Sequence, residues 1–158
     1  MIKIKFATVE DAALIAALNV DVQTVHATAL PQLFKKPMID AQLVQEFRSN
    51  LEKPDCFILI AEMESNIAGY LSAECQLWRD SPRAHQNKVV YVHHLSVSEA
   101  FRRRGIGRAL LDEARKRGSE RGITRLALDV WRFNEPARKF FAGYGLDVYN
   151  EKMWMEIG

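Results

Sequence analysis

The chain has 158 residues, of which 48% are hydrophobic and 27% are charged, and its formal net charge is +2 at pH 7. This length fits a single domain over residues 1–158, large enough to bury a core without disulfide or metal staples. The N-terminus alternates charged and apolar residues and no apolar run is long, which excludes a signal peptide and a membrane span and predicts a cytoplasmic protein.

The first forty residues carry a strand pattern, a helix pattern and a loop pattern. Residues 2–6 alternate apolar side chains with lysines, which predicts a half-exposed strand. Thr8 followed three residues later by Asp11 is a capping pattern, and the apolar spacing behind it predicts a helix that fades near Gln23. The segment from His26 to Asp40 holds two prolines among apolar side chains and is predicted to be a loop.

The middle of the chain predicts one helix and a strand hairpin. In order, these are a helix over 39–51, a strand over 56–62, its hairpin partner over 67–76 and a polar connection over 78–88. Cys56 and Cys75 lie in the strand patterns and lack metal-ligand spacing, so we expect buried, reduced thiols and no metal site.

The next strand is predicted over residues 89–97 and carries two adjacent histidines. Simple alternation divides its side chains between two faces, with Val90, Val92, His94 and Ser96 on one and Tyr91, His93, Leu95 and Val97 on the other. Polar groups that can take part in chemistry therefore fall on both faces of this strand.

A basic glycine turn follows, and it opens a helix. It reads Arg102, Arg103, Arg104, Gly105, Ile106, Gly107 and Arg108. The first N–H groups of a helix are free and lie at the positive end of its dipole, so the turn is a predicted seat for an anion such as a phosphate. Residues 102–125 contain nine basic against three acidic residues, a local balance of +6, which favours a small acidic ligand over nucleic acid.

The remaining elements complete a sheet with helices on its faces. They are a helix with an apolar stripe from Ile106 to Gly118, a parallel strand over 125–131, a helix capped by Asn134 and stopped by Gly143 and Gly145, and two terminal strands over 146–150 and 152–157.

Two linked patterns resemble the signatures of the Gcn5-related N-acetyltransferase (GNAT) family. The first is Arg102-x-x-Gly105-x-Gly107 after a strand, and the second is Asn134-x-x-Ala137-x-x-Phe140-Phe141-x-x-x-Gly145-Leu146. Their order and spacing agree with the family over residues 56–157. The resemblance implies an α/β fold of the α+β type, with a mixed, mostly antiparallel central sheet, helices on both faces, and acetyl-CoA as co-substrate.

The family's functional positions carry over onto matching residues of this chain. The resemblance implies cofactor contacts from the strand backbone, the glycine turn and the second signature, at Leu95, Ser96, Val97, Arg102, Arg103, Arg104, Gly105, Ile106, Gly107, Arg108, Asn134 and Phe141. It also implies that the segment between the first two helices, including His26 and Phe34, helps to form the acceptor site.

The catalytic groups are less well defined. His93 and His94 stand where many family members carry a carboxylate that acts as base, and a histidine has a suitable intrinsic pKa of about 6.5. Phe141 stands where the family often has the tyrosine that assists the departing CoA sulfur. Tyr144 is the nearest substitute, unless the thiolate leaves without an acid.

The interpretation is an N-acetyltransferase that transfers acetyl from acetyl-CoA to an amine of a small molecule or peptide in a ternary complex. Nucleic acid, membrane and metal are not implied, and homodimer formation is left open. A non-catalytic acyl-CoA sensor is the alternative. A dinucleotide oxidoreductase is disfavoured because Leu110 replaces the third glycine, and a kinase-type phosphate loop lacks its Gly-Lys-Ser/Thr.

Overall fold

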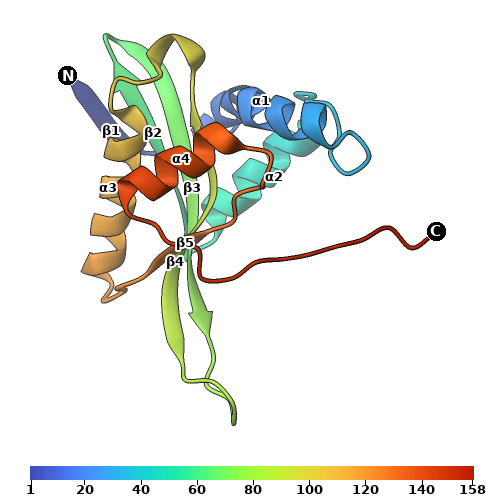
Figure 1. Ribbon diagram of the computed structural model, residues 1–158. Coiled ribbons are helices and arrows are strands. Elements are labelled where there is room, and N and C mark those ends of the chain that lie inside the picture. The colour runs from blue at the N-terminus through green and yellow to red at the C-terminus, as the bar shows by residue number, and fades with distance from the viewer.

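The protein is built on one five-stranded sheet with strand order β1-β2-β3-β4-β5, in a computed structural model that describes residues 1–158 (Figure 1). The strands are β1 Ile2–Phe6, β2 Cys56–Met63, β3 Asn66–Trp78, β4 Asn87–Val97 and β5 Leu126–Leu128. Neighbours pair antiparallel except β4 and β5, which are parallel. The predicted mixed, mostly antiparallel α+β fold is confirmed.

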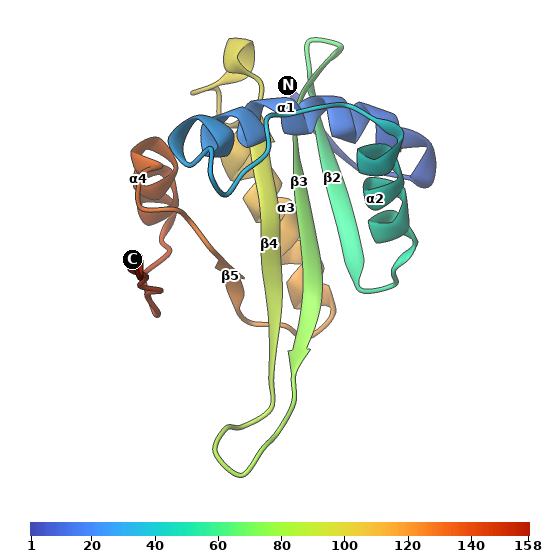
Figure 2. The same cartoon turned by 90° about the vertical axis from the view of Figure 1, so that its right-hand side faces the viewer.

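Four helices cover the two faces of this sheet. They are α1 Ala12–Ala29, α2 Ala41–Glu52, α3 Ile106–Glu120 and α4 Glu135–Tyr144. Helices α1 and α2 cover one face and α3 the other, while α4 lies beyond the β5 edge (Figure 2). None of these helices has the length and apolarity needed to cross a membrane.

Each sheet face has its own apolar core. On the α3 face, the predicted helix stripe is confirmed, because Ile106, Leu110, Leu111, Ala114 and Gly118 are all buried. Burial of a side chain the size of leucine stabilises the fold by about 1.5–3 kcal/mol. On the other face, α1 is fixed to β3 by the buried hydrogen bond from Asn19 Nδ2 to the Tyr70 hydroxyl, 2.8 Å long.

A β-bulge interrupts β4 at His93. Ser72 pairs with His94 and Ala73 pairs with Val92, so the register with β3 shifts and His93 has no partner. The alternation of β4 side chains between the two sheet faces is therefore reversed after this point. Val90, Val92, Leu95 and Val97 face α3, whereas Tyr91, His93, His94 and Ser96 share the α1/α2 face.

The simple alternation predicted for residues 89–97 is therefore wrong beyond His93. One extra residue at His93 moves each following side chain to the opposite face. As a consequence, the two histidines that alternation separates lie on the same face of the sheet. Gly69 lies against the far end of the same strand, where a side chain would clash with the Ser96 carbonyl.

Helix α1 is longer than its apolar pattern predicts, and this changes the place of His26. The helix continues to Ala29, so His26 lies in its last turn and not in the proline loop. Polar side chains in this region bond back to helix carbonyls: Thr24 Oγ1 donates to Val20 O at 2.7 Å, and a His26 ring nitrogen lies 2.7 Å from Val22 O. These local bonds maintain the helix where its apolar stripe ends.

The end of the chain differs most from the sequence-based expectation. Strand β5 has three residues instead of the predicted 125–131, because its ladder with β4 covers only the three pairs that precede the bulge. The two predicted strands over 146–150 and 152–157 are not formed, and residues 146–158 are extended without a strand partner.

Candidate functional site

The turn before α3 presents a row of free backbone donors. The N–H groups from Arg103 to Arg108 donate no hydrogen bond within the protein. Gly105 caps the helix with φ 85° and Arg103 also has a positive φ of 60°, so left-handed residues curve this backbone. Successive N–H groups in such a curve at a helix N-terminus form a concave anion site.

Gly107 serves both the turn and the packing of α3 on α4. A Cβ at this position would lie 2.9 Å from Cζ of Phe140, which is closer than side chains normally approach. The absence of a side chain therefore lets α4 lie over the first turn of α3. It also leaves the N–H of this residue uncovered.

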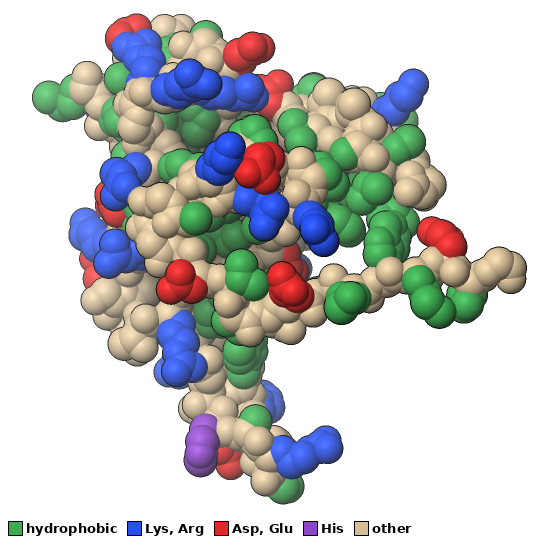
Figure 3. All heavy atoms as spheres, viewed as in Figure 1, with side chains coloured by type: hydrophobic (Ala, Val, Ile, Leu, Met, Phe, Trp, Pro, Cys, Tyr) green, Lys and Arg blue, Asp and Glu red, His purple; other side chains and the backbone are tan.

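The arginine side chains of the turn are mostly engaged by the protein itself. Arg104 forms an ion pair with Glu64, Arg102 Nε donates to Val97 O at 3.1 Å, and the Arg108 guanidinium lies 5.1 Å from the centre of the Tyr144 ring. Only Arg103 makes no such contact. Lys and Arg side chains nevertheless gather on the side that carries α3 and α4 (Figure 3), so they supply a positive field around the backbone donors.

Strand β4 has an open edge that leads to this turn. Its ladder with β5 ends at the pair Val92 and Leu128, yet β4 continues to Val97. The backbone of Leu95, Ser96 and Val97 therefore has no strand partner on the β5 side, where β4 splays from its neighbour. An extended ligand with an anionic end can pair with this edge and reach the turn.

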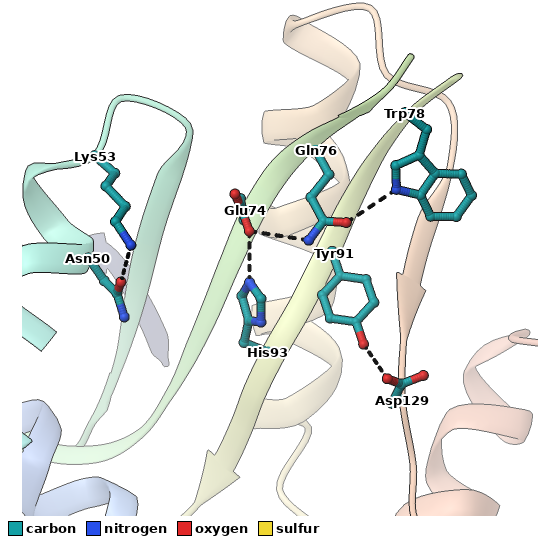
Figure 4. Close-up of polar contacts among 8 residues, drawn as sticks. All are labelled: Asn50, Lys53, Glu74, Gln76, Trp78, Tyr91, His93 and Asp129. Atoms are coloured by element: carbon teal, nitrogen blue, oxygen red, sulfur yellow. Dashed lines mark hydrogen bonds and ion pairs between the residues drawn. The ribbon is translucent and has the colours of Figure 1, made fainter. Parts of the chain in front are cut away.

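A polar cluster surrounds the bulge on the α1/α2 face. His93 Nε2 lies 3.1 Å from Glu74 Oε2, and the same carboxylate accepts a hydrogen bond from Gln76 Nε2 at 3.2 Å (Figure 4). The hydrogen bond from Gln76, and then that with His93, lower the pKa of Glu74. This carboxylate is thus held as an anion beside the imidazole.

Tyr91 and Asp129 extend the cluster toward β5. The Tyr91 hydroxyl donates to Asp129 Oδ2 at 2.6 Å, and its ring lies 5.1 Å from the His93 ring (Figure 4). Burial and the hydrogen bond to Asp129 raise the pKa of Tyr91. Sequence reasoning missed Glu74, Tyr91 and Asp129, because only the register of three strands brings them together.

His94 has a different environment from His93. Its ring packs against Phe47 and Tyr70, with ring centres 6.1 and 6.3 Å away, and its Nδ1 makes no hydrogen bond. The pKa of His94 is lowered to about 4, mainly by burial, with smaller electrostatic contributions from His93 and His26. At neutral pH this imidazole is uncharged and is a weak base.

Aromatic side chains from three segments form a wall next to the bulge. The His26 ring lies 5.0 Å from Phe34 and 5.9 Å from Phe133, while Trp131 lies 5.3 Å from Phe34 and stacks on Phe133 at 6.0 Å. The structure thus brings the predicted pair His26 and Phe34 together. It adds two residues from the β5–α4 connection, whose place in the wall no local sequence signal indicates.

The second signature forms α4 largely as predicted. Asn134 Oδ1 accepts a hydrogen bond from Ala137 N at 3.3 Å and caps the helix, and Gly145 ends it with φ 113°. The helix includes Gly143, which was predicted to stop it. Phe141 packs against the α3-side core, where it has no polar partner.

Tyr144 is the last residue of α4, and its hydroxyl is directed at α3. It donates to Asp112 Oδ1 at 2.7 Å and accepts from Arg115 Nη1 at 3.4 Å. Burial is the main cause that raises the pKa of this phenol. Both partners belong to α3, on the face of the sheet opposite His93 and Glu74.

An open depression of about 420 Å³ lies elsewhere, between the second half of α3 and the start of β5. Charged side chains such as Arg115, Lys116 and Arg125 contribute to its lining. None of the residues proposed from the sequence as catalytic or ligand-binding lines it. The candidate site is therefore the open β4 edge with the turn at one end and the bulge at the other.

Known proteins resemble this chain in sequence. The sequence model of the Acetyltransferase (GNAT) family matches residues 21–146. An uncharacterized N-acetyltransferase in the pepI 3′ region of Lactobacillus delbrueckii subsp. lactis is 28% identical over 106 residues, which cover 65% of this chain and 58% of that protein. The chain thus spans less than two thirds of the length of this relative.

Solved structures share the fold over nearly the whole chain. A tetramutant of the BH1408 protein from Bacillus halodurans superposes with a TM-score of 0.91 at 25% identity, over 98% of this chain and 99% of that one. AAC(6′)-Iy in complex with the bisubstrate analogue CoA-S-monomethyl-acetylneamine has a TM-score of 0.77 at 16% identity, over 100% and 99% of the two chains.

Proposed function

Because this chain belongs to the acetyltransferase (GNAT) family, we propose that it transfers the acetyl group of acetyl-CoA to a primary amine by direct attack in a ternary complex. The observation that carries this proposal is the continuity of the site. An unpaired strand edge at Leu95–Val97 leads to the free N–H groups of Arg103–Arg108. A cofactor with an amide-bearing arm and a diphosphate matches that sequence of donors and acceptors.

Acetyl-CoA would bind with its diphosphate at the turn and its pantetheine arm along the open edge of β4. The thioester would then lie near the bulge, where His93 interrupts the ladder. Fixing both ends of the cofactor orients the reacting carbonyl and lowers the entropic part of the barrier. Unpaired N–H groups of the splayed strand would polarise the carbonyl oxygen as charge develops on it.

The transfer itself needs one proton acceptor. The neutral amine nitrogen attacks the carbonyl carbon, the new C–N bond forms, and the C–S bond breaks to release CoA as thiolate. The nitrogen must lose a proton in this sequence. We assign that proton to His93, either directly or through a water, with Glu74 as the carboxylate that orients the imidazole at 3.1 Å.

His94 fits this role less well than His93. Its pKa of about 4 leaves it a weak proton acceptor near neutral pH, and its ring is packed among Phe47 and Tyr70. The side chain of His93 is 40% exposed and carries the carboxylate partner. Of the two adjacent histidines, His93 is therefore the candidate base and His94 is a core residue.

The acceptor amine would approach from the α1/α2 face. That face carries both the wall formed by His26, Phe34, Trp131 and Phe133 and the polar cluster with the carboxylates of Glu74 and Asp129. Aromatic faces and carboxylates both attract ammonium groups and the carbon skeletons that carry them. The proposed acceptor is thus a small molecule or peptide amine with an apolar portion near the reacting nitrogen.

Turnover of acetyl-CoA with a panel of amines tests the proposal. The panel comprises polyamines, aminoglycosides, amino acids and peptides with a free N-terminus or lysine, and the release of free CoA thiol is followed over time. Thiol release that depends on the amine and yields acetylated product supports an enzyme. CoA binding by calorimetry without turnover of any amine would instead support the acyl-CoA sensor, which the replacement of the usual tyrosine by Phe141 favours.

A further inference from the structure

The end of the chain carries a primary amine onto the side of the molecule where we place the acceptor. Residues 146–158 leave α4, pass β5 and project on the α1/α2 side (Figures 1 and 2). Within this segment, Lys152 Nζ lies 3.5 Å from Asp129 Oδ2. Asp129 also accepts the hydrogen bond from Tyr91 (Figure 4), so the ammonium group of Lys152 is in contact with the polar cluster near the bulge.

Asp129 stands at the level of the bulge in the sheet. The last pair of the β4–β5 ladder is Val92 with Leu128, and His93 and Asp129 are the residues that follow this pair on the two strands. An ammonium group on Asp129 therefore lies at the level that we propose for the thioester. A lysine has a flexible four-carbon stem, so rotation of the side chain can bring its nitrogen to the thioester carbonyl.

A second residue of the segment lies at the same cluster. Burial and the hydrogen bond to Asp129 are the main causes that raise the pKa of Tyr91, and the Tyr149 phenol adds to them. Such an electrostatic effect is strong only at short range, so Tyr149 lies near Tyr91. Contacts at two positions three residues apart thus place residues 149–152 beside the cluster.

We propose that Lys152 is a self-acetylation site, at which the chain transfers the acetyl group of acetyl-CoA to its own Nζ. This inference rests on the proposed acetyl transfer and adds an acceptor within the chain. A tethered amine has an effective concentration on the order of 1 mM or more at the site to which it is tethered. Lys152 therefore becomes the acceptor when no other amine competes for the site.

The transfer balances without an oxidant or a further co-reactant. The ammonium group first releases one proton to water, and the neutral Nζ then attacks the carbonyl carbon of the thioester. The C–N bond forms, the nitrogen passes its second proton to His93, and the C–S bond breaks, so CoA leaves as a thiolate with the electron pair of that bond. The product is a neutral amide on Lys152, which no longer forms an ion pair with Asp129.

Incubation of the full chain with acetyl-CoA and no added amine tests the inference. Lys139 on α4 is the internal control, because its side chain is 77% exposed and lies 3.7 Å from a carboxylate oxygen of Glu135. Lys152 is similarly 82% exposed and lies 3.5 Å from its carboxylate partner. Uncatalysed acetylation would treat these two lysines alike. We expect peptide mass spectrometry to give a rate constant for acetylation of Lys152 at least about tenfold that of Lys139.

Two further measurements on the same chain show where the selectivity comes from. Acetyl phosphate donates the same acetyl group but lacks the CoA portion, so with this reagent the two lysines should react at equal rates. With saturating acetyl-CoA, the rate constant for Lys152 should stay the same when the protein is diluted about tenfold, because the amine reaches the site of its own chain.

Four results would overturn the inference. They are equal rates at Lys152 and Lys139 with acetyl-CoA, the same preference for Lys152 with acetyl phosphate, a rate constant that falls in proportion on dilution, and no acetyl group on Lys152. In the last case, the amine panel decides whether the proposed function fails as well. Amine-dependent thiol release would leave acetyl transfer standing without self-acetylation, whereas no release with any amine would contradict both.

Discussion

His93 Nε2 and Glu74 Oε2 lie 3.1 Å apart although the two residues are not opposite each other in the sheet. Glu74 pairs with Tyr91, two positions before His93 along β4. Glu74 shares the sheet face of Tyr91, and His93 lies on that same face two positions further along β4, so the two groups meet diagonally across the strands. Strand pairing thus brings together the imidazole and the carboxylate that we propose as the base and its orienting group.

Replacement of His93 tests whether it accepts the proton from the amine. We expect His93→Gln to lower kcat/KM by about 10²-fold or more, which is the usual contribution of a general base, and to remove the acid limb of the pH profile. The matched control is His94→Gln, one residue away on the same face, which should keep that limb. Similar losses in both variants with an unchanged pH profile would argue against a proton-transfer role for His93.

The buried His94 should make folding stability depend on pH. Its folded pKa of about 4 lies below the value of about 6.5 expected for the unfolded chain, so the unfolded state binds a proton first as the pH falls. The stability from the neutral imidazole is present above pH 6.5 and is lost progressively down to about pH 4. Between pH 7 and 5, this loss amounts to roughly 2 kcal/mol.

Urea unfolding of the wild type and of His94→Gln at the two pH values measures that contribution. In the variant, the difference in the free energy of unfolding between pH 7 and pH 5 should be smaller than in the wild type by most of this amount, whatever the variant's absolute stability. His85→Gln, which removes an exposed histidine, is the control and should keep the wild-type difference. If His94→Gln shows the same pH dependence as the wild type, the imidazole is not held neutral by the fold.

The elements that the sequence predicts well are those fixed by neighbouring residues. The Asn134 cap, the glycine turn and the apolar stripe of α3 depend on contacts within one or two helical turns, and each is present in the structure. The continuation of α1 to Ala29 is also local, but it rests on backbone bonds of Thr24 and His26 that an apolar pattern does not reveal. Local sequence patterns therefore predict the fold class and the glycine turn at the start of α3.

The polar cluster and the chain end depend on contacts between distant segments. The bulge at His93 arises from the register between β3 and β4, and one residue of shift reverses every face assignment after it. Residues 146–158 have a strand pattern, yet they pair with no strand, although β5 is the edge of the sheet. Alternation of apolar and polar residues indicates that a segment can form a strand, but tertiary contacts decide whether the segment pairs with a neighbouring strand.

Substitution of Gly107 tests the turn as the diphosphate site. Both Gly107→Ala and Gly107→Asp add a Cβ that meets the Phe140 ring, but only the aspartate adds a negative charge beside the free N–H groups. We expect the aspartate to weaken CoA binding by at least about tenfold relative to the alanine, because like charges repel at short range. Calorimetry at low and high salt should show that the difference in CoA affinity between the two variants becomes smaller as the ionic strength rises. Equal affinities of the two variants would place the diphosphate elsewhere.

Truncation of Phe34 tests the aromatic wall as the acceptor side. Phe34→Ala removes the ring that contacts both His26 and Trp131, so the wall loses its central contact. The KM for whichever amine proves active in the panel should rise by about tenfold, while the KM for acetyl-CoA changes little. Phe6→Ala, which removes a ring that packs on Phe57 away from the wall, is the control. If the KM values for the amine and for acetyl-CoA rise equally, the aromatic wall is not the acceptor site.

Tyr144 should not act as the acid for the departing thiolate. Its hydroxyl already donates to Asp112 at 2.7 Å and lies on the α3 side, so a new bond to sulfur would require that contact to break. A thiol has an ordinary pKa of about 8.5, which makes a thiolate a tolerable leaving group without a proton donor near neutral pH. We therefore expect Tyr144→Phe to change kcat by less than about twofold at saturating substrates.

The same substitution should affect the packing of α4 on α3 instead. Loss of the hydroxyl leaves Asp112 without its 2.7 Å donor, and such partly exposed hydrogen bonds contribute about 1 kcal/mol, so the melting temperature should fall by a few degrees. Phe141→Tyr restores a hydroxyl at the position usual in the family and is the companion variant for a pH profile of kcat. A loss of about 10²-fold in Tyr144→Phe, together with loss of the alkaline limb, would identify Tyr144 as the acid and require α4 to move during the reaction.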